Sequence, residues 1–99
     1  MSKVKILLVE DEADVAEGIQ AILEDQGYSV PDVIAYGEEA IEKAGETCPD
    51  LVLMDILLKG AMDGIEAAKH IHDRFNIPVI YLTGYADEEK LQQAKLTEP

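Results

Sequence analysis

The stretch Ile6-Leu7-Leu8-Val9-Glu10-Asp11-Glu12 joins an unbroken apolar run to three consecutive acidic residues. An apolar run without polar alternation is typical of a strand that helices cover on both faces of a parallel sheet. The acids follow where such a strand ends, and open α/β sheets bind their ligands beyond the carboxyl ends of their strands. The stretch therefore predicts a buried parallel strand that delivers carboxylates to a binding edge.

Three further apolar runs repeat this arrangement, and a helical pattern follows each of them. The four runs occupy residues 4–9, 29–35, 51–56 and 78–83. Apolar residues at helical spacing lie between and after the runs at Val15, Ile19, Ile22 and Leu23, at Ala40, Ile41 and Ala44, at Ile65, Ala68, Ile71 and Phe75, and more weakly over residues 87–96. Gly27 is expected to end the first helix. Alternation of this kind predicts repeated βα units on a parallel sheet.

Pro31 interrupts the second apolar run and sets the expected order of the strands. A proline cannot donate to a strand ladder, so it is tolerated mainly at a sheet edge. The other three runs are continuously apolar, as central strands of a parallel sheet are. We therefore expect a flavodoxin-like, doubly wound α/β fold with strand order 2-1-3-4 and a crevice at the carboxyl ends of strands 1 and 3.

Polar groups gather at this expected crevice. Glu10 and Asp11 follow the first strand, Asp55 follows the third, and Thr83 ends the fourth. Carboxylates gathered at one point repel unless a cation joins them, and a site of oxygen ligands with several waters suits Mg²⁺. Asp55 would then attack a phosphoryl group as a carboxylate nucleophile, and Thr83 would donate a hydrogen bond to a phosphoryl oxygen.

Each of these residues also has an ordinary structural explanation. Acids before a helix act as N-caps and favour the positive end of the helix dipole. Asp55 is a common turn residue, and Thr83-Gly84 is a common strand exit. The shared location favours the site, because independent cap and turn residues have no reason to gather at one end of one sheet.

Four segments together resemble the receiver domain of two-component response regulators: Val9-Glu10-Asp11-Glu12, Leu51-Val52-Leu53-Met54-Asp55, Met62-Asp63-Gly64 and Pro78-Val79-Ile80-Tyr81-Leu82-Thr83-Gly84. The resemblance implies that Asp55 accepts a phosphoryl group from a sensor histidine kinase, a histidine phosphotransfer protein or a small phosphodonor. It implies that the ligands of Mg²⁺ are Glu10, Asp11, Asp55 and the backbone carbonyl of Leu57, and that Thr83 moves toward the phosphoryl group on activation. Such a domain is a signalling switch that promotes its own phosphorylation and dephosphorylation, and is not classed as an enzyme.

The chain departs from the receiver pattern in three places. Its acidic pair is Glu-Asp, and the loop after Asp55 lacks a proline and is longer by one residue. The resemblance implies a domain of five βα units. We therefore expect residues 1–99 to be a receiver domain that is incomplete at its C-terminus, with the fifth strand and helix absent. The phosphate-binding lysine and the switch aromatic belong to that unit and are not assigned. Lys59 does not match the position of that lysine.

The charge balance argues against nucleic acid as a partner. The chain holds 8 basic and 21 acidic residues, a net charge of −13, with a pI near 4.2. Nucleic-acid binding needs clustered basic side chains, so we expect no direct contact with DNA or RNA. No apolar run approaches the roughly 20 residues that span a bilayer. The N-terminus lacks a secretory pattern and the single Cys48 fits a reducing compartment, so we expect a cytoplasmic protein that makes no membrane contact.

Two other functions remain open. A receiver-like interaction module that works without phosphorylation would fit the unassigned lysine. A Mg²⁺-dependent phosphohydrolase with an aspartyl nucleophile would need an Asp-x-Asp pattern, but Ile56 and Leu57 follow Asp55. Further expected partners are an output domain, or a second copy of the chain that pairs along an unprotected strand at residues 79–82.

Overall fold

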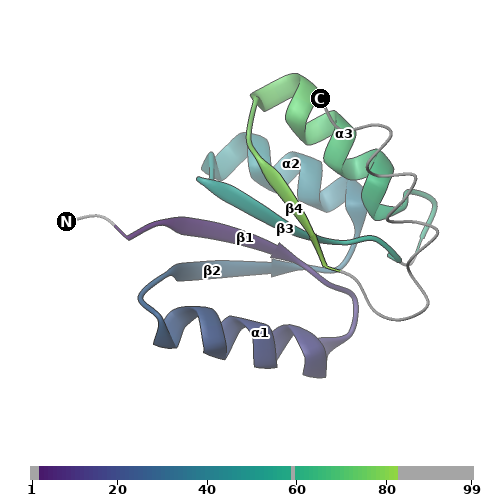
Figure 1. Ribbon diagram of the computed structural model, residues 1–99. Helices are drawn as coiled ribbons and strands as arrows, with labels where there is room; N and C mark the ends of the chain where they lie inside the picture. The colour runs from purple at the N-terminus through teal and green to yellow at the C-terminus, as the bar shows by residue number, and fades with distance from the viewer. Residues whose placement is uncertain (1–2, 59, 83–99) are drawn as a thin grey trace.

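Four strands alternate with three helices in residues 3–58 and 60–82, which the computed structural model describes (Figure 1). The strands are β1 (Lys5–Val9), β2 (Ser29–Ile34), β3 (Leu51–Asp55) and β4 (Val79–Leu82), and the helices are α1 (Ala13–Asp25), α2 (Gly37–Thr47) and α3 (Gly64–Phe75). The expected helix over residues 87–96 lies outside the described residues. None of the three helices combines the length and the apolar character needed to cross a membrane.

The sheet has the predicted order. All strand pairs are parallel and follow the sequence β2-β1-β3-β4. Pro31 lies on the edge strand β2, within a shift of register between β1 and β2. Helix α1 lies on one face of the sheet, and α2 and α3 lie on the other (Figure 1). The doubly wound, flavodoxin-like arrangement is therefore confirmed for the four strands.

The sheet separates two apolar cores, which explains the unbroken apolar runs. Alternate residues of β1 enter opposite cores: Ile6 and Leu8 pack on the side of α1, and Leu7 and Val9 pack on the side of α2 and α3. The larger core also contains Ala40, Ile41, Ala44, Val52, Met54, Ala67, Ala68 and Ile71. Because both faces of β1 are covered, neither set of its residues can be polar.

The apolar residues at helical spacing in α1 are only partly buried. Ile19 and Leu23 pack against the core on this face of the sheet, together with the buried Ala16. Val15 and Ile22 are 42% and 62% exposed, because no described element covers their flank of α1. Phe75, the last of the apolar residues at helical spacing in the third helix, is likewise exposed.

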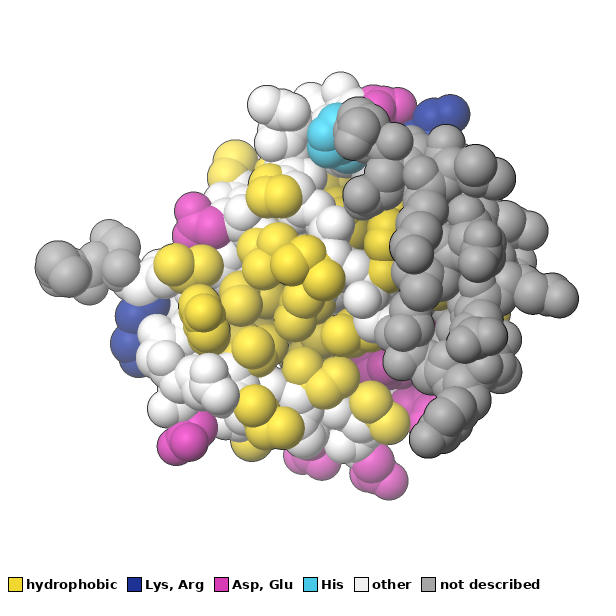
Figure 2. All heavy atoms as spheres, viewed as in Figure 1, with side chains coloured by type: hydrophobic (Ala, Val, Ile, Leu, Met, Phe, Trp, Pro, Cys, Tyr) yellow, Lys and Arg dark blue, Asp and Glu magenta, His cyan; other side chains and the backbone are white. Residues whose placement is uncertain are grey.

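The same side of the sheet carries further exposed apolar residues. Ile80 of β4 pairs with Leu53, which belongs to the α1 core, and Ile80 is 53% exposed. Figure 2 shows hydrophobic side chains gathered on this face of the molecule. Within the described part of the chain, α1 thus covers only a portion of its side of the sheet.

Local signals explain where the helices begin and end. Gly27, with a φ of 98°, follows the end of α1, as predicted. Asp63 is the N-cap of α3, and its Oδ1 accepts a hydrogen bond of 2.9 Å from the backbone N–H of Glu66. Asn76, with a φ of 57°, ends α3 in the left-handed conformation that a helix C-terminus favours.

Asp63→Ala should destabilise the protein by about 1 kcal/mol, because an N-cap hydrogen bond contributes roughly that amount. The free energy of unfolding in urea measures the change. Glu12→Ala is the matched control, since Glu12 is the N-cap of α1 and makes no side-chain cap bond. Equal losses in the two variants would contradict the role given to Asp63.

Candidate functional site

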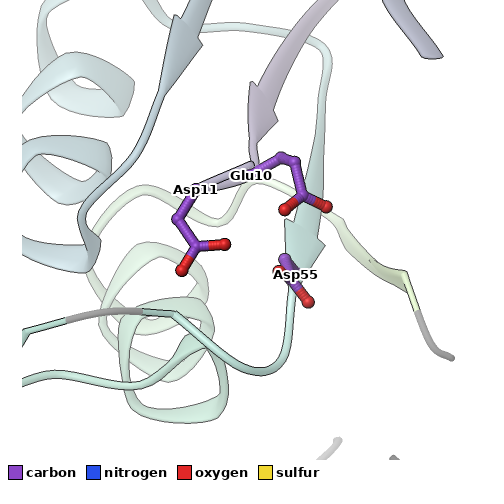
Figure 3. Close-up of side chains that lie close together, drawn as sticks. All are labelled: Glu10, Asp11 and Asp55. Carbon is purple, nitrogen blue, oxygen red and sulfur yellow. The ribbon is translucent and has the colours of Figure 1, made fainter. Parts of the chain in front are cut away.

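Three carboxylates meet at the carboxyl edge of the sheet. Glu10 and Asp11 directly follow β1, and Asp55 is the last residue of the neighbouring strand β3. The register pairs Val9 with Met54, which brings the two strand ends level. One oxygen atom from each of the three side chains lies within 4.8 Å of the others (Figure 3). The predicted convergence of Glu10, Asp11 and Asp55 is therefore seen in the structure.

Backbone N–H groups orient two of these carboxylates. The N–H of Glu12 donates to Oε2 of Glu10 at 3.0 Å, and the N–H of Leu57 donates to Oδ1 of Asp55 at 3.2 Å. The N–H of Glu10 itself donates to the carbonyl of Ile34 on β2 at 2.9 Å. The acidic groups are thus held in place by the ends of three adjacent strands.

Glu10 is the buried member of the cluster, with 8% of its surface exposed, whereas Asp11 and Asp55 are half-buried. Burial raises the pKa of Glu10 from 4.5 to about 7, with further upward contributions from Asp55 and Asp11. The hydrogen bond from the N–H of Glu12 acts in the opposite direction. A negative charge on Glu10 is therefore costly unless a cation shares the site.

The raised pKa of Glu10 should make the stability of the metal-free protein depend on pH. Between pH 4.5 and about 7 the folded carboxyl holds a proton that the unfolded chain has released, so a rise in pH through this window lowers stability. Urea unfolding in a chelator at the two ends of the window measures the effect. Because other groups also titrate, the test is the difference from Glu10→Gln, which should lack this decrease. Parallel stability profiles for the two proteins would contradict the prediction.

The donor set of the cluster fits Mg²⁺. All three side chains offer hard oxygen ligands, and their combined negative charge favours a divalent cation. Asp11 and Asp55 are half-buried, which suits an ion that keeps several waters and also binds phosphate oxygens. Leu57, whose carbonyl is the fourth expected ligand, is joined to the cluster through its N–H bond to Asp55. Thr83 and Lys59 lie outside the described residues.

The sequence did not predict a separate role for one further residue near the site. Gly64, the first residue of α3, donates its N–H to the carbonyl of Ile56 at 3.0 Å and lies against the backbone of Asp55. The available signal was a glycine at the start of a helix, directly after an N-cap Asp63. Glycine disfavours helices relative to alanine, so its presence there indicates a close approach of another group.

Comparison with known proteins agrees with this geometry. The sequence profile of the response regulator receiver domain matches residues 6–97. The response regulator protein VraR of Staphylococcus saprophyticus is 41% identical over 95 residues, a match that covers 92% of this chain and 44% of VraR. The chain thus spans less than half the length of that relative.

Solved structures show the same similarity. The signal receiver domain of a modulated diguanylate cyclase from Desulfovibrio desulfuricans G20 has a TM-score of 0.89 and 39% identity, covering 99% of this chain and 78% of that one. A chain of the CheX-CheY-BeF3-Mg+2 complex from Borrelia burgdorferi has a TM-score of 0.82 and 25% identity, covering 94% of this chain and 71% of that one.

Proposed function

Because the chain belongs to the family of response regulator receiver domains, we propose that its Asp55 accepts a phosphoryl group from a phosphohistidine in a Mg²⁺-dependent reaction. Receiver domains are signalling domains of two-component systems, so the phosphorylated aspartate would act as a switch. The observation that carries the proposal is the meeting of Glu10, Asp11 and Asp55 at the carboxyl edge of β1 and β3.

The proposed reaction moves one phosphoryl group between two side chains. A carboxylate oxygen of Asp55 attacks the phosphorus, and an O–P bond forms as the P–N bond to the donor imidazole breaks. The electron pair of the broken bond stays on the imidazole nitrogen. The N–H of Leu57 holds the attacking carboxylate in one orientation, which lowers the entropic cost of reaching the phosphorus.

Electrostatics decide whether this attack succeeds, because the nucleophile and the phosphoryl oxygens are both negative. Mg²⁺, when bound by Glu10, Asp11, Asp55 and the Leu57 carbonyl, would neutralise part of that charge. Thr83 would donate a hydrogen bond to an oxygen of the transferred group. The CheX-CheY complex was crystallised with beryllium fluoride, a mimic of a phosphoryl group, and with Mg²⁺, which supports the same chemistry here.

Incubation of the protein with acetyl phosphate tests the proposal. We expect one phosphoryl group per chain in the intact mass when Mg²⁺ is present, and none when a chelator removes it. Absence of any label would contradict the proposal and favour an interaction module that works without phosphate. Steady release of phosphate from varied phosphate esters would also contradict it, and would indicate a hydrolase.

The phosphodonor and the setting form part of the same proposal. A sensor histidine kinase or a histidine phosphotransfer protein would supply the phosphoryl group, in the cytoplasm, where Cys48 stays reduced. Phosphorylation would change how the domain contacts an output domain or a second copy of itself. A net charge of −13 opposes direct binding to the phosphates of nucleic acid or of an anionic membrane.

A further inference from the structure

Gly64 lies closer to the backbone of Asp55 than any residue with a side chain could. A methyl group built on its Cα would overlap the carbonyl oxygen of Asp55, at 2.8 Å from the Asp55 carbonyl carbon and 2.9 Å from the Cα of Ile56. The φ of Gly64 is not positive, so the requirement for glycine is one of space. The obstacle is backbone, which cannot rotate away as a flexible side chain can.

The segment against which Gly64 packs is the one that carries the proposed chemistry. The carbonyl of Ile56 accepts the N–H of Gly64, and the Ile56 side chain is fully buried. The next N–H, that of Leu57, holds the Asp55 carboxylate. The start of α3 therefore fixes the backbone of residues 55–57. This backbone in turn positions both the Asp55 carboxylate and the Leu57 carbonyl.

The far end of the same loop is packed in a similar but looser way. Gly37, the first residue of α2, faces Met62, and a Cβ there would lie 3.1 Å from the Met62 Cγ and 3.2 Å from the Met62 carbonyl oxygen. These contacts require a shift of a few tenths of an ångström and no more. Glycines at the starts of two helices thus allow α3 to approach the backbone of Ile56 and α2 to approach Met62.

We propose that Gly64 is a positioning residue for the phosphoacceptor, acting through the backbone of Asp55 and Leu57. The inference rests on the function proposed above. A side chain at residue 64 pushes the Asp55 peptide away from α3 and moves two of the expected Mg²⁺ ligands relative to Glu10 and Asp11. Mg²⁺ requires near-ideal octahedral geometry, so small ligand displacements weaken its binding.

The experiment compares Gly64→Ala with Gly45→Ala. Gly45 lies within α2, where a Cβ would lie 2.8 Å from the ring of Phe75, so this variant also crowds a helix but does so away from the carboxylates. Urea unfolding gives the stability of each variant, and Mg²⁺ titration and acetyl phosphate labelling are then measured on the folded protein. We expect Gly64→Ala to weaken Mg²⁺ binding by about tenfold or more and to slow labelling, because misplaced groups around a metal or a nucleophile have effects of this size. Gly45→Ala should keep the wild-type affinity.

A merely structural glycine would lower stability and leave the Mg²⁺ affinity of the folded molecules unchanged. Wild-type affinity and labelling in folded Gly64→Ala would therefore overturn the inference and leave the proposed function standing. A wild-type protein that neither binds Mg²⁺ nor takes the label would overturn the proposed function, and this inference with it. If Gly64→Ala does not fold in buffer alone, it is folded in a stabilising osmolyte such as trimethylamine N-oxide, with the wild type measured in the same solution. Weakened Mg²⁺ affinity of the folded variant then supports the inference, and wild-type affinity overturns it.

Discussion

Asp55→Asn should leave the protein folded and unable to take a phosphoryl group from acetyl phosphate. The amide keeps the shape of the side chain and an oxygen that can accept the N–H of Leu57, but it has no ionised oxygen to attack phosphorus. Removal of the Asp55 charge, which lies beside Glu10 and Asp11 and opposes ionisation of Glu10, should also stabilise the metal-free protein. Intact mass after labelling measures the first effect, and urea unfolding in a chelator measures the second.

Asp73→Asn is the matched control for this experiment. Asp73 lies near the end of α3, its side chain is 60% exposed, and its Oδ1 lies 3.7 Å from Nδ1 of His72, outside the carboxylate cluster. This variant should take the label as the wild type does. Undiminished labelling of Asp55→Asn would show that another residue accepts the phosphoryl group, and would contradict the role given to Asp55.

The strand order and the meeting of the carboxylates follow from features that a sequence displays directly. A strand that is covered on both faces keeps polar residues at its ends, so β1 and β3 are visible as unbroken apolar runs over residues 6–9 and 51–54. Pro31 identifies the edge strand because it lacks the donor that a central ladder requires. Once the order is known, Glu10 and Asp55 must be neighbours, since parallel strands that pair in register end at the same edge.

Other features depend on distances that a sequence pattern does not contain. Helical spacing shows that Val15 and Ile22 share a side of α1 with the core residues. It does not show how much of that side the sheet covers, and both residues are exposed. The overlap of a Cβ at Gly64 with the Asp55 carbonyl depends on where α3 begins relative to the end of β3. The pKa of Glu10 likewise depends on its burial, which its position after a strand does not reveal.

The cluster of Glu10, Asp11 and Asp55 lowers the stability of the metal-free fold. Glu10 is buried beside two other carboxylates, and the raised pKa of its carboxyl expresses the cost of its charge. A bound cation would reverse the sign of this effect, because the same charges would then attract it. Mg²⁺ should consequently stabilise the folded protein, by an amount that grows with the Mg²⁺ concentration relative to its dissociation constant.

Asp11→Asn should separate these two effects with a single substitution. Removal of a group that only supports a metal ligand weakens metal binding by about tenfold or more. Loss of a charged ligand itself should therefore weaken Mg²⁺ binding by at least about tenfold. Stability in a chelator should rise, because a charge next to buried Glu10 is gone. Added Mg²⁺ should then raise the urea midpoint of the wild type by much more than it raises the urea midpoint of the variant.

Asp14→Asn provides the control, because it removes the same charge from the exposed first turn of α1, outside the cluster. It should bind Mg²⁺ as the wild type does and gain no stability in a chelator, since an acid in the first turn interacts favourably with the helix dipole. If Asp11→Asn and Asp14→Asn respond alike to Mg²⁺ and to the chelator, the ion is bound by the general negative charge of the surface. The cluster of Glu10, Asp11 and Asp55 would then not be its site.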